Sequence, residues 1–159
     1  MLSKRAWLVI SGIQWLVVGV MLLVKGLRYL IPLADQLEAP APLLQWLVSM
    51  AGSRQQAALL IVSVALLIGF IKGRTVLAKS VNRMADRIQL QEGRLTLAQV
   101  YDKRYYLVLL LMVGLGFTLR ALHLPHDIHG GIDVAIGAAL INGGMLYFRR
   151  LYAPQQSKN

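Results

Sequence analysis

Long apolar runs separated by clusters of charged residues dominate this sequence. The runs without a charged residue cover positions 6–24, 55–71, 105–119 and 134–148. A transmembrane helix needs about 20 apolar residues, with roughly 17 as the lower limit. The first two runs reach this length, and the last two reach it if their flanking charges lie at the membrane edge. We therefore expect four transmembrane helices, at about 6–28, 54–74, 103–123 and 131–150.

The composition argues against a soluble alternative. Hydrophobic residues make up 57% of the chain and charged residues 15%, whereas soluble domains are nearer a quarter charged. If the four runs were buried core helices, too little polar sequence would remain to cover them. The first run is longer than the usual apolar part of a signal peptide, about 7–15 residues, and no convincing small-residue cleavage site follows it. We expect this segment to remain in the mature protein.

The distribution of basic residues predicts the orientation. Four spans place thirteen Lys and Arg residues on one side of the membrane and four on the other. With acidic residues included, the first side has a net charge of +10 and the second a net charge of zero. Lys and Arg accumulate in cytoplasmic loops, so both termini are expected in the cytoplasm, and a bacterial inner membrane is the expected location. The predicted fold is an all-α, up-down bundle of four transmembrane helices, and nucleic-acid binding is not expected.

Two connecting segments carry helix signals of their own. Outside the membrane, three prolines break residues 31–52, and an apolar stretch around Trp46 predicts a short helix that lies on the membrane or against the bundle. A re-entrant gate is the alternative for this helix. Ser53 and Gln56 form a capping box at the start of the second span. On the cytoplasmic side, the spacing of apolar residues between spans 2 and 3 predicts a helical hairpin.

The basic face of this hairpin is a candidate contact surface for anionic lipid or a partner protein. The residues concerned are Lys79, Arg83 and Arg87. A weak internal similarity also suggests a parallel repeat of two helical hairpins, over residues 4–90 and 96–152. Such a repeat differs from the inverted repeats of many transporters.

Polar groups inside or beside the spans are the candidate pathway residues. Arg120 and Asp133 lie at matched depth on consecutive spans, which predicts a salt bridge that either closes the hairpin or takes part in ion passage. Asn142, Lys25 and Gln14 complete this set. A polar residue in lipid marks either a pathway or a hydrogen bond between helices, and the second is the commoner case.

The outer loop before the fourth span concentrates all three histidines of the chain. Imidazole and carboxylate groups are suitable ligands for Zn²⁺ and other divalent metals. The candidate ligands are His123, His126, Asp127 and His129. The alternatives are local hydrogen bonding at headgroup level and a histidine pH sensor. No other cofactor is expected, and the chain has no cysteine.

Small residues in the fourth span predict close helix packing. Ala135, Ala139 and Gly143 recur every four positions, a spacing that lets two helix backbones approach. No catalytic constellation is present in the sequence, so an enzyme is not expected. The leading hypothesis is an ion or small-solute channel or transporter that assembles as a homo-oligomer. The alternative is a non-transporting accessory or scaffold subunit that binds a partner protein or anionic lipid through the basic hairpin.

Overall fold

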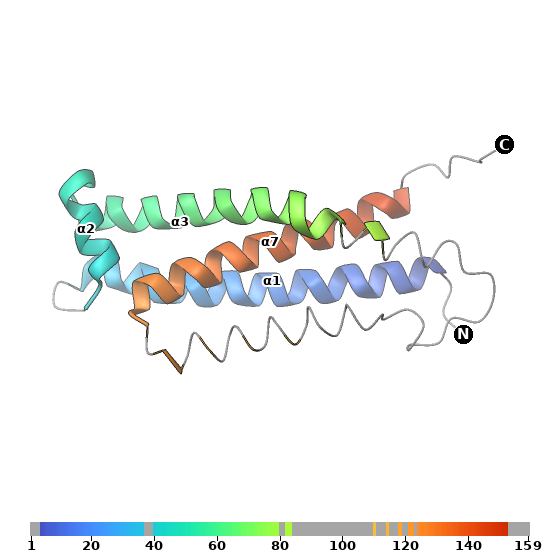
Figure 1. Cartoon of the computed structure of the whole chain (residues 1–159), viewed down its shortest axis with the longest axis horizontal. Coiled ribbons are helices and arrows are strands. Elements are labelled where there is room, and N and C mark those ends of the chain that lie inside the picture. The colour runs from blue at the N-terminus through green and yellow to red at the C-terminus, as the bar shows by residue number, and fades with distance from the viewer. Residues whose placement is uncertain are drawn as a thin grey trace.

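The computed structural model describes residues 4–36, 40–79, 82–83, 110, 114, 118, 121–122 and 124–152, and these residues include no β-strand. The elements are α1 (Lys4–Asp35), α2 (Pro42–Ala51), α3 (Arg54–Lys72), the π-helix η1 (Gly73–Leu77) and α7 (His126–Tyr152), shown in Figure 1. The predicted all-helical architecture is therefore confirmed for the described part of the chain.

Three of the described helices are long and apolar enough to cross a membrane. Their candidate spans are Leu8–Asp35, Arg54–Val76 and His126–Arg149. They correspond to the first, second and fourth predicted spans. Most of the predicted third span, 103–123, lies outside the described residues, so the four-span topology and its orientation stay predictions.

The helical ends on the predicted outer side of the membrane extend beyond the predicted limits. Helix α1 continues to Asp35 and α7 begins at His126. The added turns are stabilised by packing, because Leu30 and Leu33 of α1 are almost completely buried there. Pro125 precedes α7 without interrupting it, and its carbonyl accepts a 3.0 Å hydrogen bond from the His129 amide.

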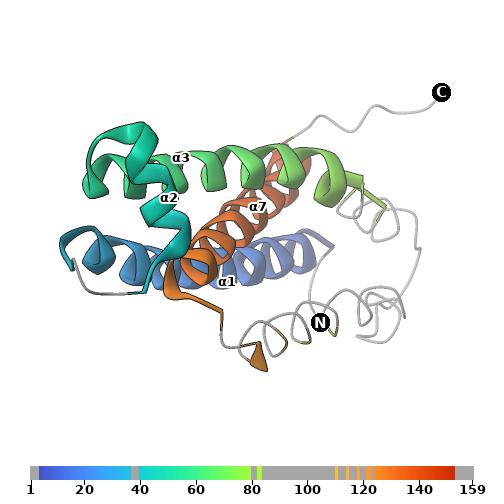
Figure 2. The ribbon, with the colours of Figure 1, turned by 60° about the vertical axis from the view of Figure 1, so that its left-hand side comes forward.

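Helix α7 lies between α1 and α3 (Figure 2), and glycines bring it close to α1. A methyl group built on Gly19 would lie 2.9 Å from the carbonyl oxygen of Gly137, and one on Gly26 would lie 2.6 Å from that of Gly130. A methyl group on Gly144 would lie 3.1 Å from the carbonyl oxygen of Gly12. The two antiparallel helices therefore meet backbone to backbone at three levels, seven residues apart.

A second set of small residues joins α7 to α3. A methyl group on Gly69 would meet the carbonyl oxygen of Ala135, and one on Gly73 would lie 2.8 Å from that of Ala139. Gly143, the third residue of the predicted stripe, is buried. Ala135 and Ala139 thus face α3, while glycines at a spacing of seven face α1.

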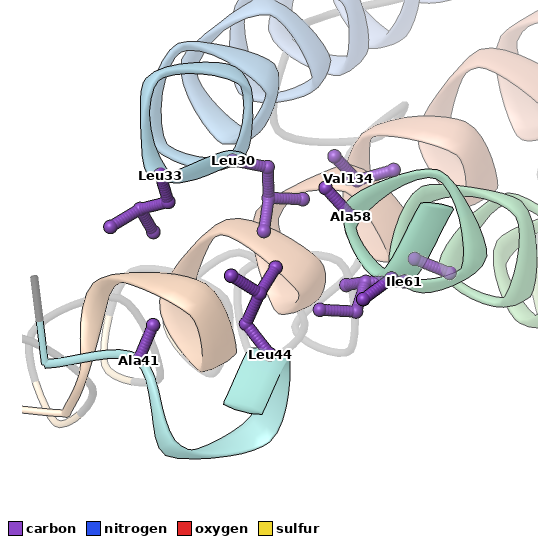
Figure 3. Close-up of a cluster of buried hydrophobic side chains, with 9 residues drawn as sticks. Leu30, Leu33, Ala41, Leu44, Ala58, Ile61 and Val134 are labelled. Atoms are coloured by element: carbon purple, nitrogen blue, oxygen red, sulfur yellow. The ribbon is translucent and has the colours of Figure 1, made fainter. Parts of the chain in front are cut away.

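The short helix α2 closes the outer end of the bundle. Its Leu44 is completely buried in a cluster with Leu30 and Leu33 of α1, Ile61 of α3 and Val134 of α7 (Figure 3). Gly52 turns the chain into α3 with a positive φ of 82°, and the Ser53 hydroxyl caps α3 by accepting a 3.2 Å hydrogen bond from Gln56 N. The apolar core is thus concentrated at this end.

Candidate functional site

An ion pair joins α1 to α7 below this outer cluster. The Lys25 ammonium nitrogen lies 3.0 Å from Oδ2 of Asp133, without the angular alignment of a hydrogen bond. The Asp133 side chain is only 6% exposed, whereas that of Lys25 is 45% exposed. Arg120, the partner predicted for Asp133, lies outside the described residues. In the described structure, Lys25 is the charged residue that pairs with Asp133.

The ion pair and the glycine register together indicate where the hydrocarbon layer begins. The glycine register is the set of three paired glycine levels at which α1 and α7 touch. Lys25 ends the uncharged stretch of α1 that starts after Arg5, and Asp133 precedes the uncharged stretch of α7 that ends before Arg149. Because Gly26 contacts Gly130 and Gly12 contacts Gly144, these two stretches lie side by side at the same depth. The nineteen uncharged residues of α1 span about 28 Å, close to the hydrocarbon thickness of a bilayer.

Tyr29 lies beside the ion pair and in contact with two histidine rings. The Tyr29 ring lies edge-on to His126 and tilted against His129, with ring centroids 5.5 Å apart in both cases. The Lys25 ammonium nitrogen lies 5.8 Å from the centroid of the Tyr29 ring, which is within the range of a cation–π contact. Tyr29 therefore links the two histidines to the ion pair.

Asp127 has a structural task at the same end. It is completely buried, and its Oδ2 accepts a 3.0 Å hydrogen bond from the backbone amide of Leu44, in the first turn of α2. Its Oδ1 accepts a 2.9 Å bond from the Ile128 amide. The residue before α2, Ala41, has no side chain that can cap the helix. Asp127 supplies that cap from another helix, and its charge is favourable at both helix N-termini.

Replacing Asp127 by alanine is expected to release the first turn of α2. The loss of a helix cap costs about 0.5–2 kcal/mol, so hydrogen exchange of the α2 amides should accelerate by roughly 2- to 30-fold. Asp127→Asn keeps one acceptor oxygen and should show a smaller effect. Asp35→Ala is the control, because Asp35 is exposed at the same end and accepts only a 3.5 Å bond from Gln55. Equal exchange in Asp127→Ala and Asp35→Ala would contradict the capping role.

The predicted metal ligands do not converge where the structure describes them. Both carboxylate oxygens of Asp127 accept backbone hydrogen bonds, and His126 and His129 pack on Tyr29. Within the described ranges, no three His, Asp or Glu side chains are placed to hold a metal ion. His123 lies outside those ranges, so metal binding stays a prediction.

Two carboxamide side chains lie near the middle of the membrane region. Asn142 is half-buried, donates a 2.9 Å hydrogen bond to the carbonyl oxygen of Ala138, and packs its Cβ where a methyl group on Gly73 would lie. Gln14 is exposed on α1. The glycine register places Gln14 level with Asn142, but the two side chains are on different faces of the bundle. They do not line one common path.

The C-terminal end of α3, on the predicted inner side of the membrane, presents basic side chains. Arg74 stacks over the Phe70 ring, with its guanidinium carbon 4.9 Å from the centroid, and Lys72, Lys79 and Arg83 are exposed. Arg87 lies outside the described residues. The π-helix η1 continues α3 directly, so this basic surface extends from the end of the span.

Sequence reasoning missed two features of these sites. Tyr29 has no motif that marks it as a partner of the histidines. The glycine contact had a detectable signal, since Gly12, Gly19 and Gly26 are spaced by seven, as are Gly130, Gly137 and Gly144. A comparison of the chain with protein-family models, curated proteins and solved structures finds no match.

Proposed function

We propose that this protein is a non-transporting membrane subunit whose basic inner surface binds anionic lipid or a partner protein. One observation carries the choice over a channel: apart from Gln14, the described polar groups that were candidates for a pathway are engaged within the bundle. Asp133 pairs with Lys25, and Asn142 bonds to its own helix. Helix α7 contacts both α1 and α3 through backbone atoms, which leaves no width for water between these helices at the levels of contact.

The proposed binding surface consists of basic side chains at the end of α3. Lys72, Arg74, Lys79 and Arg83 are exposed at the inner end of α3, and the stacking of Arg74 on Phe70 orders one of these charges at the membrane boundary. Clustered Lys and Arg beside a span attract anionic headgroups, with about 1 kcal/mol for each charge. The proposed ligand chemistry is therefore a phosphate-bearing or acidic group on the cytoplasmic side.

The test combines a flux assay with a lipid-retention assay on the full chain. In liposomes, the wild-type protein should pass K⁺ and Cl⁻ no faster than protein-free liposomes. In nanodiscs of mixed phosphatidylglycerol and phosphatidylcholine, Lys79→Glu/Arg83→Glu should weaken phosphatidylglycerol binding by roughly tenfold, while Arg28→Glu, on the outer side, should not. Flux above the protein-free level would refute the non-transporting role. Unchanged lipid retention in the double variant would leave a partner protein as the ligand of this surface.

A homo-oligomeric channel remains the second candidate because of Gln14. This carboxamide is exposed midway along α1, where a polar side chain suits a path formed between copies better than contact with lipid. The flux assay separates the two functions directly.

A further inference from the structure

We infer that the protein forms a parallel homodimer through the face of α1 centred on Gln14. This inference does not depend on the proposed function, because a dimer is compatible with both a silent subunit and a channel. It rests on the depth of Gln14, on the helix face to which it belongs, and on the absence of a suitable hydrogen-bonding group at that depth in the other spans.

Gln14 lies too deep to reach water. It is eleven residues from Lys25 and nine from Arg5, or about 16 Å and 14 Å along the helix axis. A glutamine side chain extends only a few ångströms, so it cannot place its amide in the headgroup layer. An amide without hydrogen bonds in hydrocarbon costs several kcal/mol. A partner for this group is therefore expected within the membrane.

The face that carries Gln14 is directed away from α7. Gln14 follows Gly12 by two residues, which is about 200° around the helix, and Gly12 is in contact with α7. The same exposed face contains Ile10, Val17 and Met21, whose exposed fractions are 41%, 61% and 62%. Gln14 thus stands in the middle of an apolar surface that no described helix covers.

Outside α1, the described spans offer no side-chain partner at this depth. Between Gln56 and Lys72, α3 has only Ser63 as a side chain with hydrogen-bonding groups. Ser63 lies near the outer edge, because Ile61 packs against Gly131. Between Tyr106 and Thr118, the predicted third span has no side chain with hydrogen-bonding groups, and Thr118 already donates a 2.8 Å bond to the Gly114 carbonyl.

The remaining carboxamide at this level does not serve Gln14 either. Asn142 packs against Gly73 of α3, on the other side of α7 from α1, and donates to its own helix. Among the described residues, no helix other than α1 therefore offers Gln14 a side-chain partner of matching depth.

A second copy of the chain supplies a hydrogen-bonding partner for Gln14 by symmetry. Copies inserted with the same orientation bring identical depths together, so a two-fold axis along the membrane normal places Gln14 opposite Gln14. A carboxamide has both donor and acceptor groups, so this pair is self-complementary. Glutamine side chains are known to hydrogen-bond between transmembrane helices. The occupant of this face is accordingly a second copy of the chain.

Disulfide cross-linking tests the face directly, because the chain has no cysteine of its own. In liposomes, oxidation should link Met21→Cys into dimers, since Met21 lies one heptad from Gln14 on the same face. Leu67→Cys is the matched control, because Leu67 is 59% exposed on α3. It should link at least about fivefold less efficiently. Equal cross-linking at the two positions would overturn the assignment of this face.

Fluorescence energy transfer between labelled copies tests the role of Gln14 itself. Gln14→Leu should weaken dimerisation by roughly 3- to 30-fold, the range expected for one hydrogen bond between helices in a membrane. Gln14→Asn, which keeps the carboxamide, should retain most of it. Because position 14 is exposed, both variants should keep the wild-type helix content. Undiminished transfer in Gln14→Leu, or a wild-type protein that stays monomeric at every lipid-to-protein ratio, would refute the dimer.

Discussion

Replacing Gly137 by alanine is expected to lower the melting temperature by roughly 2–12 °C, although alanine is the better helix former. The added methyl group would lie 2.6 Å from the amide nitrogen of Leu23 and 2.7 Å from the carbonyl oxygen of Gly19. Both are backbone atoms, which cannot rotate out of the way. The two helices must therefore separate, and the contacts at the neighbouring glycine levels weaken with them.

The same substitution at Gly114 is the control. A methyl group at this position meets no atom within 4 Å, so Gly114→Ala should leave the melting temperature unchanged or raise it slightly. The transition can be followed by tryptophan fluorescence of the detergent-solubilised protein. A Gly137→Ala variant as stable as Gly114→Ala would show that α1 and α7 do not approach as closely as described.

Removing Lys25 is expected to destabilise the protein more than removing its partner. Lys25→Met leaves the Asp133 carboxylate, with only 6% of its side chain exposed, without a counter-charge. Breaking a buried ion pair from one side costs about 3–5 kcal/mol. Asp133→Asn leaves Lys25 instead, which is 45% exposed and can extend toward the headgroups. Its cost should be smaller, about 1 kcal/mol.

A double-mutant cycle separates the pairing energy from local effects. The Lys25→Met/Asp133→Asn protein should recover a large part of the stability lost in Lys25→Met, because no buried charge remains unpaired. Reversible unfolding measured in lipid nanodiscs or mild detergent would supply the free energies. If the two single losses simply add, Lys25 and Asp133 do not interact, and Asp133 must be stabilised by another group.

The sequence predicted the helices better than their contacts. Uncharged runs locate α1, α3 and α7 because the hydrocarbon core excludes charge over a fixed thickness. The short outer helix around Trp46 was also expected, and the capping hydroxyl of Ser53 is confirmed. The extra outer turns were not expected, since their stability comes from burial of residues such as Leu30 in a cluster contributed by four helices.

Contacts between side chains of the candidate site were harder to predict from the sequence, because the depth of a residue in the membrane does not determine which helices are neighbours. Asp133 was assigned Arg120 as a partner, which lies outside the described residues, and the sequence did not indicate that Lys25 of the first span lies beside it. Asp127 looked like a metal ligand in sequence, and only the fold shows that its carboxylate meets the start of α2. Both contacts join distant parts of the chain, and no local pattern encodes such a contact.

The pairing of the first helix with the last has a consequence for biosynthesis. A ribosome adds about 5–20 residues per second and releases the N-terminal segments first. Helix α1 therefore enters the membrane several seconds before α7 exists, and its glycine surface has no α7 to contact during that interval. Likewise, the Leu44 amide cannot donate its hydrogen bond to Asp127, 83 residues downstream, until that residue has been synthesised. Assembly of the outer end must then be completed late, when the final segment is inserted beside helices already in the bilayer.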